Sequence, residues 1–331
     1  MKLKKKKKIM SASIRNFNSI RRALLKARSV AISGHINPDG DSIGSILALG
    51  LALESLGKKV YMLCQDDVPP GYKYLPGATR LLKTTKSRVD LAIAVDCSVI
   101  ELLDKNIQVF KKAKSILEID HHAYRKAFGD LRIIDHEAAA VGELIYLLLA
   151  KCGITITRDI SENLLTSIIV ETNLFKLTNV RWYTFKVCAE LLSTGLNFYQ
   201  LVEKVYGPKT RQTMMLLGMV LLRAKFLKNG AIVWSIIRKD DLKKVGGKEY
   251  DADAIANELR SIKGVRIAVL FREKNDRMLR VSLRSAAYDI DVGKIAWNHE
   301  GGGHFDIAGC FIANNKRHMR NILSEVEGLV A

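Results

Sequence analysis

Short apolar runs that each end in an acidic residue or a histidine constrain the fold of this chain more than any other feature. The first run, residues 30–32, leads into residues 33–45, which read S-G-H-I-N-P-D-G-D-S-I-G-S. A helical pattern that begins at Ser42 follows. The loop therefore lies at the carboxyl end of a predicted strand, where open α/β sheets bind their ligands. It carries three strong metal ligands: His35, Asp39 and Asp41.

Three later apolar runs end in the same way. They are residues 91–95 before Asp96, residues 116–119 before Asp120-His121-His122, and residues 168–170 before Glu171. A single aspartate after a strand is often a helix cap or a turn residue. Four such segments at one edge of a sheet would instead bring their side chains into one cluster. Imidazole and carboxylate groups together suit a divalent cation such as Mn²⁺ or Mg²⁺.

Alternating strand and helix patterns between residues 30 and 192 predict an α/β fold with a doubly wound parallel sheet. The predicted strands are 30–34, 60–64, 91–96, 115–119, 132–134 and 167–170. The predicted helices are 42–56, 140–151, 160–166, 181–194 and 197–205. A long helical pattern at 209–227 precedes a smaller α/β region. That region has predicted strands at 231–237, 265–273 and 278–284 and a predicted helix at 251–262.

These patterns divide the chain into four parts. They are a basic tail at 1–13 that we expect to be disordered, a first domain at 14–195, a helical linker at 196–229 and a second domain at 230–331. The tail contains five consecutive lysines without a hydrophobic segment after them, so it does not match a secretory signal. A solvated tail is the preferred interpretation of the lysine run, and attraction of nucleic acid is the alternative.

Composition restricts the partners and the compartment. The 331 residues carry a formal net charge of +19, and a basic surface attracts polyphosphates and nucleic acid. A charge excess that only keeps the protein in solution is the alternative. No apolar run reaches the ~18 residues of a membrane span, so we expect no membrane partner. The five cysteines are odd in number and lack C-x-x-C spacing, which indicates reduced thiols in the cytoplasm and no structural zinc.

The motifs together resemble one family. The set H-x-x-P-D-G-D at His35, D-C-S at Asp96, D-H-H at Asp120 and the acidic residue Glu171 is similar to the motifs of the DHH phosphoesterase superfamily. The fourth motif departs from the family's D-T-G-x-F, because Glu171 replaces the aspartate and Asn173 replaces the glycine. Near the C-terminus, the arginine–serine pair and the glycine-rich segment resemble the DHH-associated C-terminal domain. Those residues are Arg284, Ser285, Gly301, Gly302, Gly303 and His304. The length and this second domain most resemble the nanoRNase and pAp phosphatase group.

The resemblance implies a site for two divalent cations, with Mn²⁺ expected and Mg²⁺ or Co²⁺ as alternatives. Asp96 would bridge the two ions. His35 and Asp39 would complete one metal site, and Asp41, His121 and Glu171 would complete the other. His122 would face the substrate phosphate or protonate the leaving oxygen, and Asp120 would orient an imidazole. Arg284, Ser285, the glycine triplet and His304 would bind substrate, although a glycine triplet taken alone indicates a turn.

The resemblance implies hydrolysis of short single-stranded RNA to mononucleotides, with removal of the 3′-phosphate from pAp as a second activity. The first domain would be catalytic and the second would bind substrate. A phosphodiesterase acting on cyclic or linear dinucleotides is an alternative of the same class. A nucleotide-binding sensor without catalysis is an alternative of another class. A homodimer is compatible with the sequence.

Overall fold

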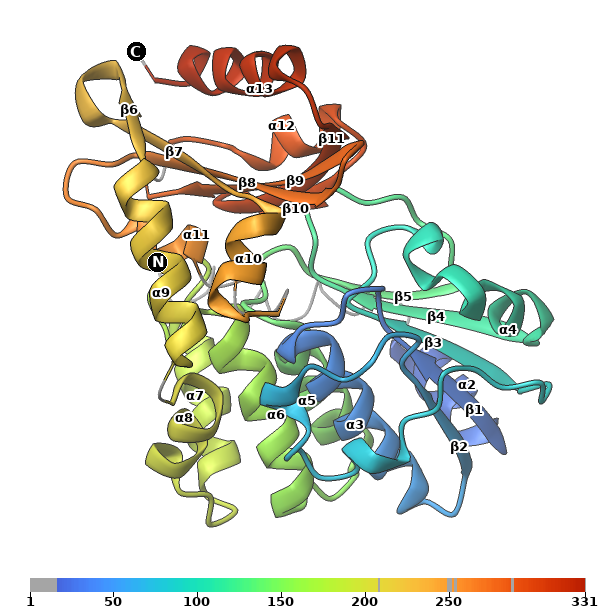
Figure 1. The fold of residues 1–331 in the computed structure, drawn as a ribbon. Helices are drawn as coiled ribbons and strands as arrows, with labels where there is room; N and C mark the ends of the chain where they lie inside the picture. Colours follow the sequence, from blue (N-terminus) through green and yellow to red (C-terminus); the bar gives the residue numbers. More distant parts are fainter. Residues whose placement is uncertain (1–16, 208, 249–251, 253–254, 287–288, 331) are drawn as a thin grey trace, which may run out of the picture. The chain divides into compact units, whose positions relative to one another are not determined.

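Figure 1 shows a computed structural model of the chain, which describes residues 17–207, 209–248, 252, 255–286 and 289–330. The predicted basic tail, residues 1–13, lies outside the described residues. The chain divides between residues 207 and 208 into two compact units. Among the described helices, none combines the length and the apolar character that a bilayer crossing needs.

The first unit is built on a five-stranded parallel sheet, which confirms the predicted fold class. Its strand order is β2-β1-β3-β4-β5, and every pair of neighbours is parallel. The strands are β1 (Ser29–Ser33), β2 (Lys59–Leu63), β3 (Leu91–Val95), β4 (Ser115–Asp120) and β5 (Leu131–Ile134). All five residues of β3 are buried, as expected for a central strand that is covered on both faces.

Helices cover both faces of this sheet. Val30 and Ile32 of β1 belong to the larger hydrophobic cluster, whereas Ala31 between them packs in a second cluster with Phe110 of α4. The helices are α2 (Phe17–Lys26), α3 (Gly40–Glu54), α4 (Ile107–Lys112), α5 (Val141–Cys152), α6 (Arg158–Glu171), α7 (Trp182–Leu192) and α8 (Phe198–Tyr206). Short 3₁₀ helices are η1 (Pro70–Tyr72), η2 (Ala78–Arg80) and η3 (Ile100–Asn106).

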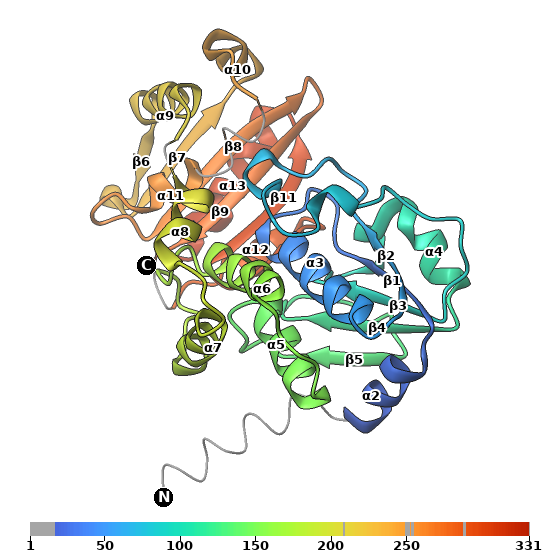
Figure 2. The same ribbon diagram turned by 90° about the horizontal axis from the view of Figure 1, so that it is seen from below.

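Helix α3 packs closely against α5 and α6, and Figure 2 shows the three helices side by side. Gly44 permits the close approach of α3 to α6, because a Cβ at this position would lie 2.5 Å from the carbonyl oxygen of Asn163. This contact brings Ser167 of α6 against the first turn of α3. The packing of α3 against α6 therefore forms one side of the region in which the Asp41 side chain lies.

The predicted strand at 167–170 is wrong. These residues are the last turns of α6, which also contains the predicted helix 160–166 and runs from Arg158 to Glu171. Thr157 caps the helix by accepting a hydrogen bond from the N–H of Ile160. Because α6 is buried on several sides, its apolar run lacks the spacing that distinguishes a helix from a buried strand. Glu171 thus follows a helix rather than a strand.

The second unit is a six-stranded mixed sheet with helices on both faces. The strand order is β10-β11-β9-β8-β7-β6, and β7 and β8 form its one parallel pair among the described residues. The strands are β6 (Lys225–Leu227), β7 (Ile232–Ile237), β8 (Ile267–Asn275), β9 (Met278–Ser285), β10 (Gly302–Gly303) and β11 (Ile307–Ala313). The helices are α9 (Arg211–Arg223), α10 (Lys239–Val245), α11 (Ile255–Arg260), α12 (Gly293–Asn298) and α13 (Lys316–Gly328), with the 3₁₀ helix η4 (Lys228–Gly230).

Two predictions in this region need correction. The helix predicted at 209–227 ends with α9 at Arg223, and the next residues form the edge strand β6. The helix predicted at 251–262 corresponds to the shorter α11, while residues 251, 253 and 254 lie outside the described part of the chain. The proposed linker at 196–229 therefore contains α8, α9 and β6, on both sides of the division at 207 and 208.

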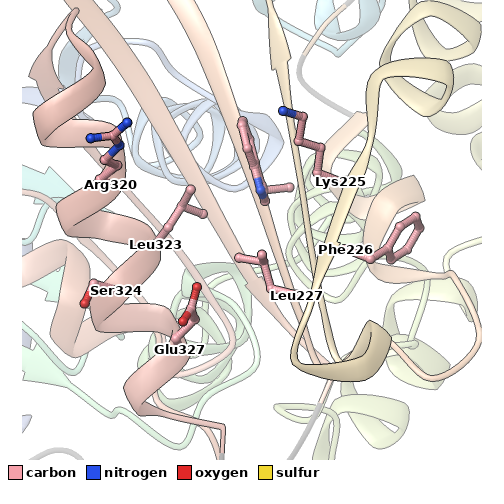
Figure 3. Close-up of a pocket in the computed structure, with 8 residues that line it drawn as sticks. Lys225, Phe226, Leu227, Arg320, Leu323, Ser324 and Glu327 are labelled. Carbon is pink, nitrogen blue, oxygen red and sulfur yellow. The ribbon is translucent and has the colours of Figure 1, made fainter.

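A hollow of about 540 Å³ lies between the edge strand β6 and helix α13 (Figure 3). The residues that line it are Lys225, Phe226, Leu227, Trp234, Arg320, Leu323, Ser324 and Glu327. The ammonium group of Lys225 lies 5.4 Å from the centre of the Trp234 ring. The hollow is thus mixed in character, because aromatic and aliphatic side chains and charged groups of both signs line it.

Candidate metal centre

Three neighbouring parallel strands deliver the acidic and imidazole side chains to one edge of the first unit's sheet. The strands are β1, β3 and β4, which are adjacent in the strand order. His35 and Asp39 follow β1, Asp96 follows β3, and His121 follows β4. Because the strands are parallel, their carboxyl ends meet at one edge of the sheet. The sheet thus brings together residues from three separate motifs.

Asp96 stands between two groups of side chains. Its Oδ2 lies 3.3 Å from Nε2 of His35, and that nitrogen lies 3.9 Å from Oδ1 of Asp39. Its Oδ1 lies 3.7 Å from Nε2 of His121. The same His121 nitrogen lies 3.6 Å from Oδ2 of Asp41 and 3.9 Å from Oε1 of Glu171. Each oxygen of Asp96 therefore faces a different group.

The spacing of these atoms fits two cations. The ligand atoms of His35, Asp39 and Asp96 lie within 4.8 Å of one another, and so do those of Asp41, Asp96 and His121. Two ligands of one ion, each about 2.1 Å from it, are roughly 3 Å or more apart. The contact of 3.3 Å between His35 and Asp96 is at the long end of hydrogen bonds, the other separations of 3.6 to 3.9 Å are beyond it, and all are close to this ligand spacing.

In two histidines, the hydrogen bond made by Nδ1 fixes the direction in which Nε2 points. Nδ1 of His121 donates to the carbonyl oxygen of Ala138 at 3.0 Å, and Nδ1 of His35 donates to the carbonyl of Ile36 at 2.8 Å. A carbonyl oxygen only accepts, so Nδ1 must carry the proton in these contacts. In the neutral ring, Nε2 then directs a lone pair into the cluster. This is the arrangement that metal-binding histidines use.

The backbone at Asp96 has the left-handed conformation, with φ of 54°. Aspartate tolerates this conformation better than most residues. The N–H of Asp96 donates to the carbonyl of Ile119 at 3.0 Å, which ties the turn to β4. This sharp turn at the end of β3 places the carboxylate among the other side chains.

Asp39 serves as the N-cap of α3, which is the alternative role that its position in the sequence suggested. Its Oδ1 accepts hydrogen bonds from the N–H groups of Asp41 and Ser42, both at 3.0 Å. The same oxygen faces His35. Capping and membership of the cluster are therefore compatible for this residue.

Asp41 is fully buried and held by four donors. They are the hydroxyls of Ser45 and Ser167 and the N–H groups of Val141 and Gly142. Burial, followed by the charges of Asp96 and Asp39, raises the pKa of Asp41 well above its ordinary value. Burial and the nearby His122 lower the pKa of His121. A cation beside these two groups would favour an ionised carboxylate and a neutral imidazole, which are their metal-binding forms.

The pKa values of His35 and Asp96 shift in the opposite sense. Burial alone would lower the pKa of His35, but the hydrogen bond with Asp96 and the charges of Asp39 and Asp96 raise it to about 10. Burial would raise the pKa of Asp96, but His35 and the other two histidines lower it. Without a metal, a proton therefore occupies the contact between these two residues.

His122 makes a different set of contacts. Its Nδ1 lies 2.7 Å from Oδ1 of Asp120 and 3.6 Å from Oδ1 of Asp96. Burial would lower the pKa of His122, but Asp120, by its charge and its hydrogen bond, raises it to about 9. Asp120 also accepts a hydrogen bond from Nε of Arg125 at 3.0 Å. No pattern in the sequence singles out Arg125.

Glu171 reaches the cluster from the end of α6. The turn after it contains three consecutive residues with positive φ, namely Asn173 at 44°, Leu174 at 56° and Phe175 at 62°. The buried Thr172 stabilises this turn, because its hydroxyl donates to Ile168 and accepts from the N–H of Phe175. Asn173, which replaces a glycine of the family motif, thus occupies a position that favours glycine.

The predicted substrate-binding residues all lie in the second unit. In the glycine triplet, Gly301 leads into β10, and Gly302 and Gly303 form this strand, where Gly302 pairs with Gly309 of β11. A Cβ on Gly301 would lie 2.3 Å from the carbonyl oxygen of Gly309, so backbone packing alone requires glycine here. His304, at the end of β10, donates its N–H to the carbonyl of Ile307.

Arg284 and Ser285 end strand β9 and make contacts inside their own unit. Nε of Arg284 donates to the side chain of Asn257 at 2.8 Å, and its Nη1 donates to the carbonyl of Leu283 at 2.9 Å. Ser285 is buried, and its N–H donates to the carbonyl of Asp306. A substrate role for these residues stays a prediction, and the contacts show that they also support the local fold.

Comparisons with known proteins agree with the two-unit division. Residues 29–170 match the family described as "DHH family, N-terminal domain", and residues 231–331 match the "DHHA1 domain". The Thermus thermophilus protein named "Bifunctional oligoribonuclease and PAP phosphatase NrnA" is 29% identical over 85% of this chain and 83% of its own. The Bacillus subtilis protein of the same name is 27% identical over 83% of this chain and 87% of its own.

Among solved structures, an exopolyphosphatase-related protein from Bacteroides fragilis has the same fold. Its TM-score to this chain is 0.84 at 24% sequence identity, and the match covers 93% of this chain and 94% of that one. Both units of this chain are therefore found together in a solved structure.

Proposed function

The chain belongs to the DHH phosphoesterase superfamily, and from this premise we propose that it hydrolyses short RNA oligonucleotides to mononucleotides with two divalent cations. The observation that carries the proposal is the position of Asp96, whose two oxygens face two separate groups of ligand atoms. The relatives that are named oligoribonuclease and PAP phosphatase support the substrate class and add pAp as a second substrate.

The residues divide into two ligand sets in this proposal. His35 and Asp39 would hold one ion, Asp41, His121 and Glu171 would hold the other, and Asp96 would contribute to both. When bound, two such cations lower the pKa of a water molecule and neutralise charge on the phosphate. Mn²⁺ suits this mixture of imidazole and carboxylate ligands, with Mg²⁺ or Co²⁺ as substitutes.

The other residues act on the substrate. His122, which Asp120 orients through Nδ1, presents Nε2 to the leaving oxygen and gives it a proton as the P–O bond breaks. A water oxygen forms the new bond to phosphorus and loses a proton to solvent, while the electron pair of the broken bond stays on the leaving oxygen. The second unit holds a terminal phosphate through Arg284, Ser285, His304 and the glycine segment Gly301, Gly302 and Gly303.

A substrate panel with Mn²⁺ tests this function. The panel contains RNA of two to seven nucleotides, pAp, cyclic dinucleotides, linear dinucleotides with a 5′-phosphate, and pyrophosphate. We expect turnover of the short RNAs and of pAp, and none in excess EDTA. If the protein hydrolysed only the cyclic dinucleotides, it would be a cyclic-dinucleotide phosphodiesterase, and the proposed function would be wrong. Binding of nucleotides without turnover of any member would support a sensor and contradict the proposal.

A further inference from the structure

Arg125 lies in the loop between β4 and β5 and contacts two buried carboxylates of β4, those of Glu118 and Asp120. Its Nε lies 3.0 Å from Oδ2 of Asp120, and its Nη2 lies 3.0 Å from Oε2 of Glu118. The Arg125 side chain is 10% exposed, and both carboxylate side chains are 1% exposed. At this depth the ion pairs are little screened by salt in the solvent.

The two oxygens of Asp120 have separate tasks. Oδ2 accepts from Arg125, whereas Oδ1 accepts from Nδ1 of His122 at 2.7 Å and from the N–H of His121 at 2.9 Å. A carboxylate rotates about one bond, so a contact that fixes one oxygen also fixes the other. Arg125 therefore sets the angle at which Asp120 meets the His122 ring.

The loop that carries Arg125 is itself anchored. The N–H of Lys126 donates to the carbonyl of Ser98 at 2.9 Å, and the N–H of Phe128 donates to Oε1 of Glu118 at 2.7 Å. A Cβ on Gly129 would lie 2.7 Å from Cγ of Glu118, so the loop passes directly over this side chain. Glu118 thus holds the loop and balances the charge of Arg125, but it does not contact His122 in the contacts described.

We propose that Arg125 is a positioning residue for the reaction, because it fixes the His122 imidazole through Asp120. The consequence for the rate rests on the proposed function, in which His122 gives a proton to the leaving oxygen. Without Arg125, only the backbone N–H groups of His121 and His122 and the His122 ring hold the Asp120 carboxylate, through Oδ1 alone, so the direction of Nε2 of His122 is less well defined. Arg125 supplies no proton and touches no substrate atom in this account.

A pair of variants isolates the contact between Arg125 and Asp120. Removing Arg125 alone would leave two buried carboxylates without a cation, which can unfold the domain. The comparison is therefore between Glu118→Gln, which keeps Arg125 beside Asp120, and the double variant Glu118→Gln/Arg125→Met. The double variant removes one positive and one negative charge from the wild-type network. Circular dichroism and thermal unfolding establish that both variants are folded.

The first readout is the hydrogen bond itself and needs no turnover. In protein loaded with Mg²⁺, which is diamagnetic, the Nδ1 proton of His122 should give a low-field NMR signal, assigned by its loss in His122→Asn. We expect this signal in Glu118→Gln and its loss or broadening in the double variant. An unchanged signal in the double variant would overturn the positioning role, even if the proposed substrates proved wrong.

The second readout is the dependence on the leaving group. For an RNA dinucleotide, whose leaving oxygen needs a proton, kcat of the double variant should be roughly 10- to 100-fold below that of Glu118→Gln. For bis-p-nitrophenyl phosphate, whose leaving group departs without a proton, the two kcat values should be similar. Equal losses on both substrates would contradict the proposal and indicate a structural role only. No turnover of any substrate by the wild-type enzyme would contradict the proposed function, while the NMR comparison would still decide the role of Arg125.

Arg223→Met provides the matched control. Like Arg125, Arg223 pairs with a buried aspartate, Asp241, but it does so through two nitrogens and lies in the second unit. Its loss should lower the stability of that unit without changing the ratio of kcat values between the two substrates. If Arg223→Met changed this ratio of kcat values in the same way, the effect would come from general destabilisation, and the proposal would be overturned.

Discussion

Nε2 of His35 lies 3.3 Å from Oδ2 of Asp96, although 60 residues separate the two in the sequence. They meet because β1 and β3 are parallel neighbours whose carboxyl ends lie side by side. The other oxygen of Asp96 faces His121, which follows β4. One carboxylate at the middle strand thus joins the contributions of three strands.

Metal binding should release protons and strengthen as pH rises. In the metal-free protein the pKa of His35 is raised to about 10, so below pH 10 its ring carries a proton that a cation must displace. Manganese affinity should therefore increase about tenfold per pH unit for each proton released. Calorimetry between pH 6 and 8, in two buffers with different ionisation enthalpies, counts these protons. An affinity that does not change with pH would show that His35 is not a ligand.

Glu171→Gln should raise the manganese concentration needed for half-maximal rate. The amide keeps the size of the side chain but loses the negative charge that faces Nε2 of His121 at 3.9 Å. Glu162→Gln is the control on the same helix, because Glu162 pairs with Lys204 outside the cluster. If the two variants require the same manganese concentration as the wild type, Glu171 does not take part in metal binding.

At position 173, in the turn after α6, glycine should make the protein more stable than alanine does. Asn173 has φ of 44°, where a residue with an ordinary Cβ costs roughly 1–2 kcal/mol relative to glycine. We therefore expect Asn173→Gly to have a free energy of unfolding about 1 kcal/mol higher than Asn173→Ala. Urea unfolding of both variants measures this difference. Equal stabilities would mean that the turn does not hold the left-handed conformation.

His304→Ala should separate substrate binding from metal binding. The substitution lies in the second unit, whereas all proposed metal ligands lie in the first, so calorimetric binding of Mn²⁺ should be unchanged. Loss of a charged hydrogen bond to phosphate costs on the order of 1.5–3 kcal/mol, or roughly ten- to a hundredfold in kcat/KM for a dinucleotide that carries a 5′-phosphate. The loss should be smaller for bis-p-nitrophenyl phosphate, which has no terminal phosphate. Equal losses on both substrates would exclude a role in holding that phosphate.

The sequence predicted the parallel sheet and its ligand edge, because the strands β1, β3 and β4 each lead into an acidic residue or a histidine. Asp96 and His121 could be placed at one edge for this reason. Glu171 could not be placed correctly, because the apolar run before it is compatible with a buried helix and a buried strand alike. Resemblance to the family motif, rather than periodicity, pointed to this residue.

Contacts that arise only from tertiary structure could not be predicted from the sequence. Ser167 donates to Asp41 across 126 positions of the sequence, and only the close packing of α3 on α6 brings the two together. No sequence motif identifies Arg125, because its contacts depend on the path of one loop over Glu118. The edge strand β6 was missed because its three residues continue the apolar pattern of α9.

The most direct test of the central claim is manganese-dependent turnover of an RNA dinucleotide by the wild-type enzyme and by Asp96→Asn. Asparagine has nearly the same shape as aspartate and tolerates φ of 54°, so the variant should fold, as circular dichroism would verify. It lacks the charge that both ions would share. We predict turnover by the wild type that EDTA abolishes and manganese restores, and no measurable turnover by folded Asp96→Asn at any manganese concentration. Turnover by this variant at a rate near that of the wild type would contradict the account.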